Sequence, residues 1–281
     1  MGKDVQTVET PSGKGAADEN FPVGSWLIPR DLRPHVASYY AFARAIDDIA
    51  DNPALASADK IARLDGFAAA LMGEDDDPAY AKAHSLRATL KATGIPAAHG
   101  LDLISAFKQD AVKPRYENWG ELIDYCLRSA SPVGRFLCDL HGEDRALYPL
   151  SDALCNALQF INHLQDCAKD YAEMDRVYLP QDWMRAEGAT VADLKNPAAT
   201  PALRRVLDRC VAGTEKLLLD ARKLPKAMKH RSLAAEAAII VSIADKLTRR
   251  LGREDPVAAR VALGPLGYAG AAAGGLLRLW F

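Results

Sequence analysis

Residues 159–170 read QFINHLQDCAKD, a segment whose polar members recur at the spacing of one helix face. Four of them stand at positions i, i+3, i+7 and i+11, where core hydrophobes are usual: Gln159, Asn162, Asp166 and Asp170. Apolar residues occupy the remaining faces, so the pattern indicates a buried helix. A buried face of amides and carboxylates needs partners, because unpaired polar groups are costly to remove from water. A bound cation would supply them, and a solvated stripe is the simpler alternative.

A second acidic segment, residues 39–51, reads YYAFARAIDDIAD. Asp47 and Asp51 are four residues apart, which places them on one helix face about 6 Å from each other. Like charges at this spacing destabilise a helix by about 0.2–0.5 kcal/mol, so the pair indicates either a strained helix end or a cation site. Arg44 lies three residues before Asp47, where it can form a helical ion pair or stabilise a departing anion.

Both segments favour a hard metal ion, because their aligned side chains offer oxygen ligands only. Mg²⁺ usually takes one or two carboxylates and completes its shell with water and substrate phosphates. Two such sets on two buried helices, facing each other across a cavity, therefore predict a site for a diphosphate and Mg²⁺. The candidate metal ligands are Asp47, Asp48, Asp51, Asn162, Asp166 and Asp170.

Composition and periodicity predict an all-α fold. The 281 residues include 49% apolar but only 7% aromatic side chains, and alanine dominates the apolar class, which favours helix over sheet. Helices are expected at 34–51, 57–73 with Ser57 as N-cap, 78–92, 97–110, 119–141, 148–173, 201–223 and 231–252. Residues 176–201 are expected to be irregular, with a short helix after Pro180. We expect a flexible arm at 1–18, one helical domain at 19–263 around a central cavity, and an apolar tail at 264–281.

Charge and cysteine usage exclude several function classes. The net charge of −2 gives no electrostatic reason to expect a nucleic-acid partner. The five cysteines lie too far apart for a metal knuckle or a small disulfide framework, so we expect free thiols and a cytoplasmic protein. The tail at 264–281 is too short for a bilayer span and is interrupted by Arg278. It either touches the inner face of the membrane peripherally or folds back on the core.

Four motifs in order give the chain a family resemblance: residues 39–51, Tyr125-Cys126 followed by Pro132-Val133-Gly134, residues 159–170, and Arg176-Val177-Tyr178-Leu179-Pro180. The chain resembles the squalene/phytoene synthase family of head-to-head prenyl-diphosphate synthases over residues 20–263. Within it, the segments around residues 19–26, 129–134 and 162–167 are most similar to the branch of bacterial hopanoid pathways. The resemblance implies an isoprenoid-synthase fold, Mg²⁺ dependence, and conversion of presqualene diphosphate plus water to hydroxysqualene and diphosphate.

The resemblance also implies roles for single residues. The candidate catalytic residues are Arg44, Tyr125, Ser131 and Asn162, the last three as groups that position water. The candidate substrate-binding residues are Asn20, Phe21, Tyr40, Arg44, Gln159, Gln165, Arg176 and Tyr178. Arg176 and Tyr178 either close over the diphosphate or form a surface turn. His163 points about 100° from the metal face and is interpreted as structural.

Two other functions remain open at this stage. One is a transferase of the same fold that condenses two prenyl diphosphates to presqualene diphosphate, squalene or phytoene. The other is a non-catalytic helical protein that binds lipid.

For the conversion of presqualene diphosphate and water to hydroxysqualene, Tyr125 and Ser131 must approach one cavity. Six residues of regular helix would separate them by about 240° around the helix axis. We therefore expect the helix to be interrupted at Ser131-Pro132, where proline removes a backbone donor.

Overall fold

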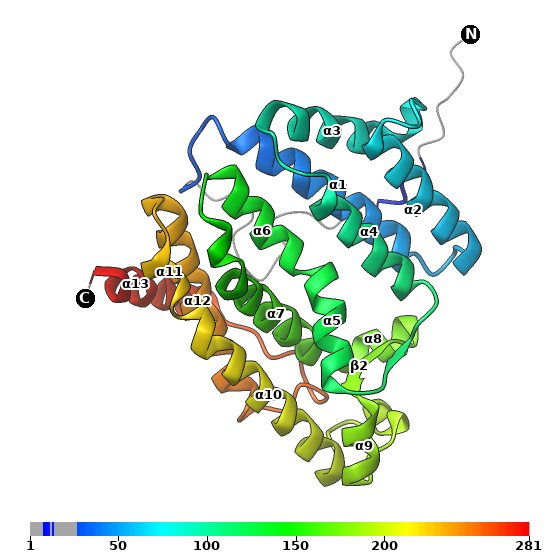
Figure 1. Ribbon diagram of the computed structural model, residues 1–281. Helices are drawn as coiled ribbons and strands as arrows, with labels where there is room; N and C mark the ends of the chain where they lie inside the picture. The colour runs from blue at the N-terminus through cyan, green and yellow to red at the C-terminus, as the bar shows by residue number, and fades with distance from the viewer. Residues whose placement is uncertain (1–7, 12, 14–26, 281) are drawn as a thin grey trace. The chain divides into compact units, whose positions relative to one another are not determined.

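The computed structural model describes residues 8–11, 13 and 27–280, and within them it confirms the all-α prediction (Figure 1). The chain divides into two compact units, Met1–Val112 and Lys113–Phe281. The sequence gives no signal for this boundary, because the connection from residue 111 to 114 is short and carries no run of glycine or serine. Most of the expected arm, 1–18, lies outside the described residues, and within it Glu9 pairs with Lys82 and Thr10 donates to the Asp48 carbonyl.

The N-terminal unit consists of α1 (Arg33–Asp51), α2 (Ser57–Met72), the 3₁₀ turn η2 (Pro78–Tyr80), α3 (Ala81–Thr93) and α4 (Ala98–Asp110). Helix α1 contacts the other three helices and is buried on most sides, as its apolar pattern predicts. Pro34 lies in its first turn, where the missing N–H costs nothing. The Ser57 N-cap prediction is wrong: Ala56 is the N-cap, and Ser57 Oγ donates to the Ala111 carbonyl at 2.6 Å.

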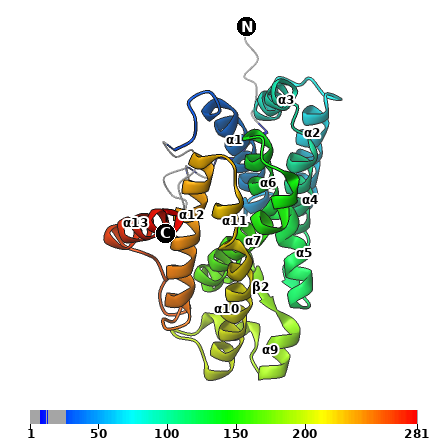
Figure 2. The same cartoon turned by 60° about the vertical axis from the view of Figure 1, so that its left-hand side comes forward.

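The C-terminal unit is built around one helix, α7 (Tyr148–Gln165), which packs against α5 (Trp119–Ser129), α6 (Ser131–Leu140), α10 (Pro201–Ala221) and α12 (Arg231–Leu251) (Figure 2). The remaining elements are β1 (Arg115–Tyr116), η3 (Arg145–Leu147), α8 (Cys167–Met174), β2 (Val177–Pro180), α9 (Gln181–Glu187), η4 (Val191–Lys195), α11 (Leu224–Ala227) and α13 (Pro265–Trp280). Eleven of the 18 residues of α7 are buried, so its polar side chains must find partners inside the protein.

The predicted helix 119–141 is wrong as a single element, because it is divided into α5 and α6. Ala130, with φ −125° and ψ −48°, leaves the helical region directly before Ser131. Pro132 then occupies the first turn of α6, where its ring is tolerated. The interruption expected at Ser131-Pro132 is therefore confirmed, one residue earlier.

The predicted helix 148–173 is wrong in the same way. Asp166, with φ −107° and ψ 9°, separates α7 from α8. Its amide still donates to the Asn162 carbonyl at 3.0 Å, and its carbonyl accepts from the Asp170 amide at 2.8 Å. The kink is confined to this residue, and the second acidic segment spans two helices rather than one straight face.

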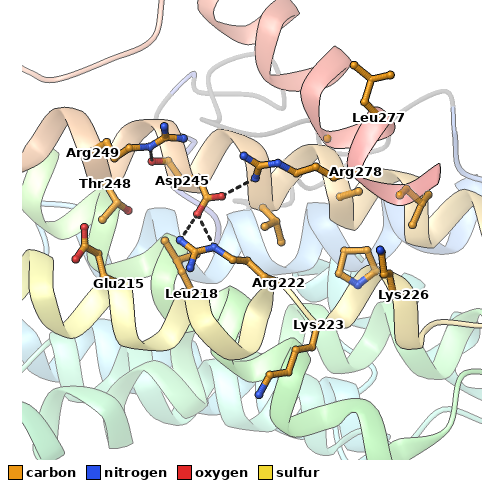
Figure 3. Close-up of a pocket in the computed structure, with 15 residues that line it drawn as sticks. Glu215, Leu218, Arg222, Lys223, Lys226, Asp245, Thr248, Arg249, Leu277 and Arg278 are labelled. Atoms are coloured by element: carbon orange, nitrogen blue, oxygen red, sulfur yellow. Dashed lines mark hydrogen bonds and ion pairs between the residues drawn. The ribbon is translucent and has the colours of Figure 1, made fainter. Parts of the chain in front are cut away.

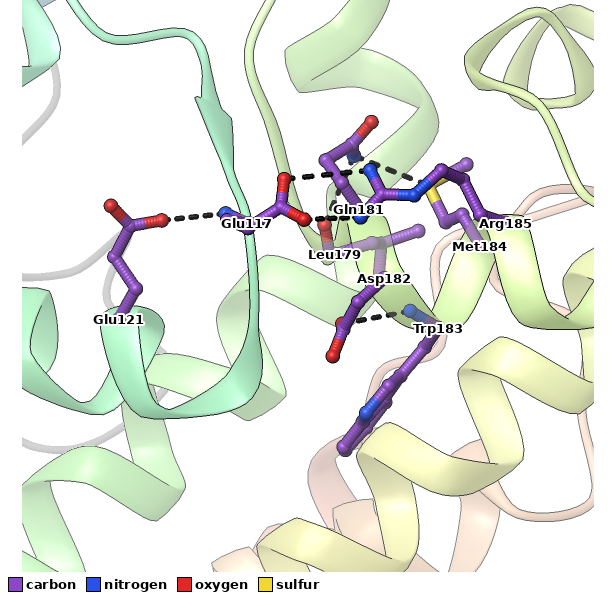
Figure 4. Close-up of polar contacts among 8 residues, drawn as sticks. All are labelled: Glu117, Glu121, Leu179, Gln181, Asp182, Trp183, Met184 and Arg185. Carbon is purple, nitrogen blue, oxygen red and sulfur yellow. Dashed lines mark hydrogen bonds and ion pairs between the residues drawn. The ribbon is translucent and has the colours of Figure 1, made fainter.

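Strands β1 and β2 pair in parallel and replace the irregular segment expected after residue 176. The Val177 amide donates to the Pro114 carbonyl at 2.9 Å. Arg185 on α9 forms an ion pair with Glu117, whose own amide donates to Glu121 Oε2 at 2.5 Å (Figure 4). These contacts fix β2 and α9 to the turn that precedes α5, so the surface-turn alternative for Tyr178 is wrong.

The apolar tail forms helix α13, which packs along α12 (Figure 2). A Cβ at Gly275 would come within 2.5 Å of the Ala238 carbonyl oxygen, so the two backbones touch at this point. Leu277 and Leu266 nevertheless remain exposed. No helix in the described part of the chain is long and apolar enough to span a bilayer. The five cysteines are all free, as expected.

Candidate active site

The first acidic cluster lies at the end of α1, within the N-terminal unit. Arg44 Nη1 lies 3.1 Å from Asp47 Oδ2, and its Nε donates to Asp48 Oδ1 at 2.9 Å. The Asp48 side chain is only 7% exposed, so this ion pair is largely shielded from water. The helical ion-pair interpretation of Arg44 is thus confirmed, with Asp48 as a second partner.

Negative charge exceeds positive charge around Asp47. Burial, followed by the charge of Asp51, raises the pKa of the Asp47 carboxyl well above its usual range, although Arg44 opposes the shift. Asp48 and Asp110 add smaller contributions in the same direction. Asp110 is buried at the end of α4, and the sequence analysis missed it because a single acid in an amphipathic helix carries no signal. A divalent cation bound beside these carboxylates would offset their mutual repulsion, and the metal site at this cluster stays a prediction.

Replacing Asp47 should separate stability from function. Asp47→Asn removes a repelled charge, so the metal-free protein should melt roughly 2–4 °C higher than the wild type. The rise in melting temperature on adding Mg²⁺ should shrink, and turnover should fall about 10²-fold or more. Thermal melts with and without Mg²⁺, together with steady-state rates, measure both effects.

Glu74→Gln is the matched control, because Glu74 is exposed in the loop after α2. It should leave the melting temperature, the Mg²⁺ response and turnover unchanged. A lower melting temperature for metal-free Asp47→Asn, or an undiminished Mg²⁺ response, would contradict the cation assignment.

The second acidic cluster lies at the α7–α8 kink, within the C-terminal unit. Arg260 holds the Asp166 carboxylate through two donors, Nε at 2.7 Å and Nη2 at 3.2 Å. The adjacent Gln165 is buried, and its amide donates to the Val261 carbonyl. Sequence reasoning missed Arg260, because it lies in the irregular segment between α12 and α13, where no periodicity points to a partner. Both contacts tie this segment to the kink.

The described residues contain no group of three or more His, Cys, Asp or Glu side chains arranged to hold one metal ion. The metal ligands named from the sequence therefore stay a prediction, each within its own unit. Asp51 is half-buried at the end of α1, one turn after Asp47. Asp170 is half-buried in the first turn of α8. Asn162 is half-buried on the last turn of α7.

An aromatic cluster joins α5, α7 and the two strands of the C-terminal unit. The His163 ring stacks on Tyr178 with centroids 3.9 Å apart and an interplanar angle of 7°. Tyr125 lies 5.6 Å from Tyr178 and 6.1 Å from His163, and Tyr116 lies 5.2 Å from Tyr125. All four side chains are buried. The cluster unites Tyr125 and Tyr178, which the sequence proposed separately, and adds two residues that it did not propose.

His163 is a buried imidazole within the aromatic cluster, and its interpretation as structural is not contradicted. Burial lowers the pKa of its imidazole to about 3, so the ring is neutral in the folded protein at physiological pH. One ring nitrogen, Nε2, lies 3.0 Å from Gln159 Nε2, whereas the buried Nδ1 has no hydrogen-bond partner within the described structure. A neutral imidazole between stacked rings can accept or donate one hydrogen bond without bringing charge into an apolar site.

The buried imidazole predicts an acid-sensitive stability. The folded protein holds the pKa of His163 below its ordinary value of 6.5, so only the unfolded chain gains a proton as the pH falls through that value. Stability is therefore lost on acidification, and between about pH 7 and about pH 5 this one group should account for about 2 kcal/mol. His163→Phe keeps a stacking ring and should lose that much less over the same interval, as measured by urea unfolding.

Tyr178→Phe is the control for this series, because it alters the same stack without removing a group that titrates between these pH values. It should keep the wild-type difference between the two pH values. An identical pH dependence for His163→Phe and the wild type would show that the ring is not held neutral by burial.

Ser131, the first residue of α6, contacts the face of α7 that carries the aromatic cluster, at a position away from the cluster. Its buried Oγ donates to Asn156 Oδ1 at 2.9 Å. Asn156 and His163 are seven residues apart, hence on one face and about 10 Å from each other along the helix. The break at Ala130 thus directs Ser131 and Tyr125 to one helix face, and it does not bring them into contact.

The other proposed residues are placed as follows. Arg176 is buried directly before β2, and its amide donates to the Asp170 carbonyl at 3.2 Å. Tyr40 is half-buried on α1. Asn20 and Phe21 lie outside the described residues. Phe160 on α7 stacks on Trp119 at 4.0 Å between centroids and is part of the core.

Comparison with known proteins identifies the family of the chain. The family model described as squalene/phytoene synthase matches residues 15–266. The chain belongs to the squalene/phytoene synthase family. It is therefore an enzyme of the class that acts on prenyl diphosphates, and the non-catalytic alternative is wrong.

Within the family, similarity is high to proteins named hydroxysqualene synthase. One from Zymomonas mobilis is 46% identical over 89% of this chain and 84% of that protein, and one from Rhodopseudomonas palustris is 44% identical over 92% and 88%. The solved squalene synthase HpnC of Alicyclobacillus acidocaldarius is 35% identical, with a TM-score of 0.71 over 82% of this chain and 88% of that one. A dehydrosqualene synthase, 20% identical with a TM-score of 0.75, shares the fold.

Proposed function

We propose that this enzyme converts presqualene diphosphate and water to hydroxysqualene and diphosphate, within bacterial squalene and hopanoid biosynthesis. The observation that carries the proposal is the identity of 43–46% to three proteins named hydroxysqualene synthase, each matched over nearly nine-tenths of this chain or more. In the reaction the carbon–oxygen bond to the diphosphate breaks, and the electron pair leaves with the diphosphate. The oxygen of water then bonds to the carbocation and releases a proton.

Mg²⁺, when bound, would neutralise the charge that develops on the leaving diphosphate. In the N-terminal unit we assign Asp47, Asp48 and Asp51 to hold it, and in the C-terminal unit Asn162, Asp166 and Asp170. Arg44 and Arg260, which now neutralise carboxylates of these clusters, are placed to transfer hydrogen bonds to phosphate oxygens. Gln159, Gln165 and Arg176 remain substrate-binding candidates on the same grounds as in the sequence.

The aromatic cluster fits the carbocation that ionisation leaves behind. Tyr116, Tyr125 and Tyr178 turn ring faces toward one another in a buried region, where each face is worth about 0.5–2 kcal/mol to a cation. Their packing also excludes bulk water, which would otherwise quench the cation at several carbons. Neutral His163 adds no competing positive charge at this place.

A single assay tests the proposed reaction. The purified enzyme with Mg²⁺ should convert presqualene diphosphate to hydroxysqualene, and the alcohol oxygen should carry the label when the reaction runs in ¹⁸O-water. Farnesyl diphosphate supplied alone should give no product. Formation of squalene or phytoene from two prenyl diphosphates would instead establish the transferase alternative. A 15-cis-phytoene synthase that is 30% identical to this chain is the reason to test it.

The residues that hold water should control the product. Tyr125→Phe and Ser131→Ala each remove one hydroxyl from the face of α7 described above, so the alcohol fraction should fall and alkenes should increase. Tyr148→Phe is the matched control, because its hydroxyl donates to Asp139 Oδ1 at 2.6 Å, outside the cluster. Gas chromatography of the products measures the ratio. An unchanged alcohol fraction in both variants would remove these hydroxyls from the mechanism.

The proposal includes a place of action. Substrate and product are long hydrocarbons with little solubility in water, and the exposed leucines of α13 offer an apolar contact at the protein surface. We therefore place the enzyme in the cytoplasm, in peripheral contact with the inner face of the membrane. The packing of α13 on α12 makes this contact a property of the folded C-terminal unit rather than of a loose tail.

A further inference from the structure

A groove of about 1130 Å³ lies between α10, α11, α12 and α13, within the C-terminal unit and apart from the aromatic cluster (Figure 3). Its lining is largely apolar and includes Leu218, Val241 and Leu277. Leu277 on α13, which lines the groove, is 60% exposed. An apolar groove that carries an exposed leucine is unusual on a protein surface that only water covers.

Cationic side chains surround this apolar lining. Five line the groove, namely Arg222, Lys223, Lys226, Arg249 and Arg278, against two carboxylates, Glu215 and Asp245 (Figure 3). Asp245, only 5% exposed, accepts from Arg222 Nη2 at 2.7 Å and from Arg278 Nη1 at 2.9 Å. The buried carboxylate therefore holds two guanidinium groups from different helices at the groove and neutralises only one of them.

Two cations of the groove, Arg249 and Lys226, form no ion pair with a carboxylate among the described residues. Arg249 Nε donates to the backbone carbonyl of Asp245 at 3.0 Å, which leaves its charge intact. Within the described structure Lys226 has no carboxylate partner, whereas Lys223 pairs with Asp220 at 2.7 Å. Thr248, 2% exposed, lines the groove with a hydroxyl that lacks a hydrogen-bond partner there. The groove thus combines an excess of positive charge with an unused polar group.

We propose that this groove binds the phosphate head group of an anionic phospholipid at the membrane surface, with Leu277 toward the acyl chains. The arginines on Asp245 supply donors to the phosphate oxygens, and Arg249 and Lys226, at opposite ends of the groove (Figure 3), add positive charge that attracts the anionic membrane surface. The proposal rests on the membrane contact within the proposed function, and it does not depend on which prenyl diphosphate reacts.

A phospholipid suits the groove better than a prenyl diphosphate does. A phosphodiester carries one negative charge and needs no metal, whereas a diphosphate brings Mg²⁺ and requires carboxylates to hold it. Here Asp245 is already occupied by two arginines, which leaves too few carboxylates for a metal site. A bilayer also accounts for the exposed Leu277, since it would remove this side chain from water.

Vesicle sedimentation tests the proposal without any turnover. The wild type should bind vesicles of phosphatidylcholine with phosphatidylglycerol and should bind phosphatidylcholine alone only weakly. The double variant Lys226→Gln/Arg249→Gln should lose about tenfold or more in affinity for the anionic vesicles. Lys91→Gln/Arg253→Gln removes the same charge from exposed positions outside the groove and should retain wild-type binding within about threefold. Leu277→Ser should weaken binding to the anionic vesicles while leaving the helix content unchanged.

Turnover of detergent-dispersed presqualene diphosphate should be the same in all these variants. No preference for anionic vesicles, or equal losses in the two double variants, would overturn the proposal. So would a raised KM in Lys226→Gln/Arg249→Gln with unchanged vesicle binding, because that result would assign the groove to the prenyl diphosphate. Intact lipid selectivity in an enzyme that makes no hydroxysqualene would refute the proposed reaction alone.

Discussion

Helix α7 buries a polar face, and the C-terminal unit is organised around satisfying it. Asn156 accepts from Ser131, His163 lies between Gln159 and the Tyr178 ring, and Asp166 takes two donors from Arg260. Ser131, Tyr178 and Arg260 come from three different elements, so these contacts orient α6, β2 and the segment after α12 toward one helix. A helix with the same length and an apolar face would pack by shape alone and would leave these elements less precisely oriented.

The sequence predicts this requirement but not its solution. The i, i+3, i+7, i+11 spacing of polar residues is visible in residues 159–170, and Pro132 marks the division between α5 and α6. Nothing local predicts the kink at Asp166, because its backbone hydrogen bonds continue on both sides. Partners far along the chain, such as Arg260 and Val261, carry no periodic signal and become visible only in three dimensions.

His163 shows that the direction in which a side chain leaves its helix does not predict which residues it contacts. His163 points away from the polar face on an ideal wheel, and this favours a structural role. The structure brings a strand, β2, to that side of the helix and stacks Tyr178 on the ring. Spacing predicts where a side chain leaves its own helix, whereas the function of that side chain depends on what another element places there. Arg44 is the opposite case, since Asp47 and Asp48 lie three and four residues after it and the spacing alone identifies Asp47 as a partner.

The contact between Gly275 and Ala238 separates two kinds of positions on the last helix. The inward side is limited by the α12 backbone, which leaves no room for even a methyl group at residue 275. The outward side, including residues 266 and 277, touches nothing that the fold requires. We expect outward substitutions to change which surfaces the enzyme binds and to leave its reaction unchanged. Affinity for a surface and chemistry would then be adjustable independently within one chain.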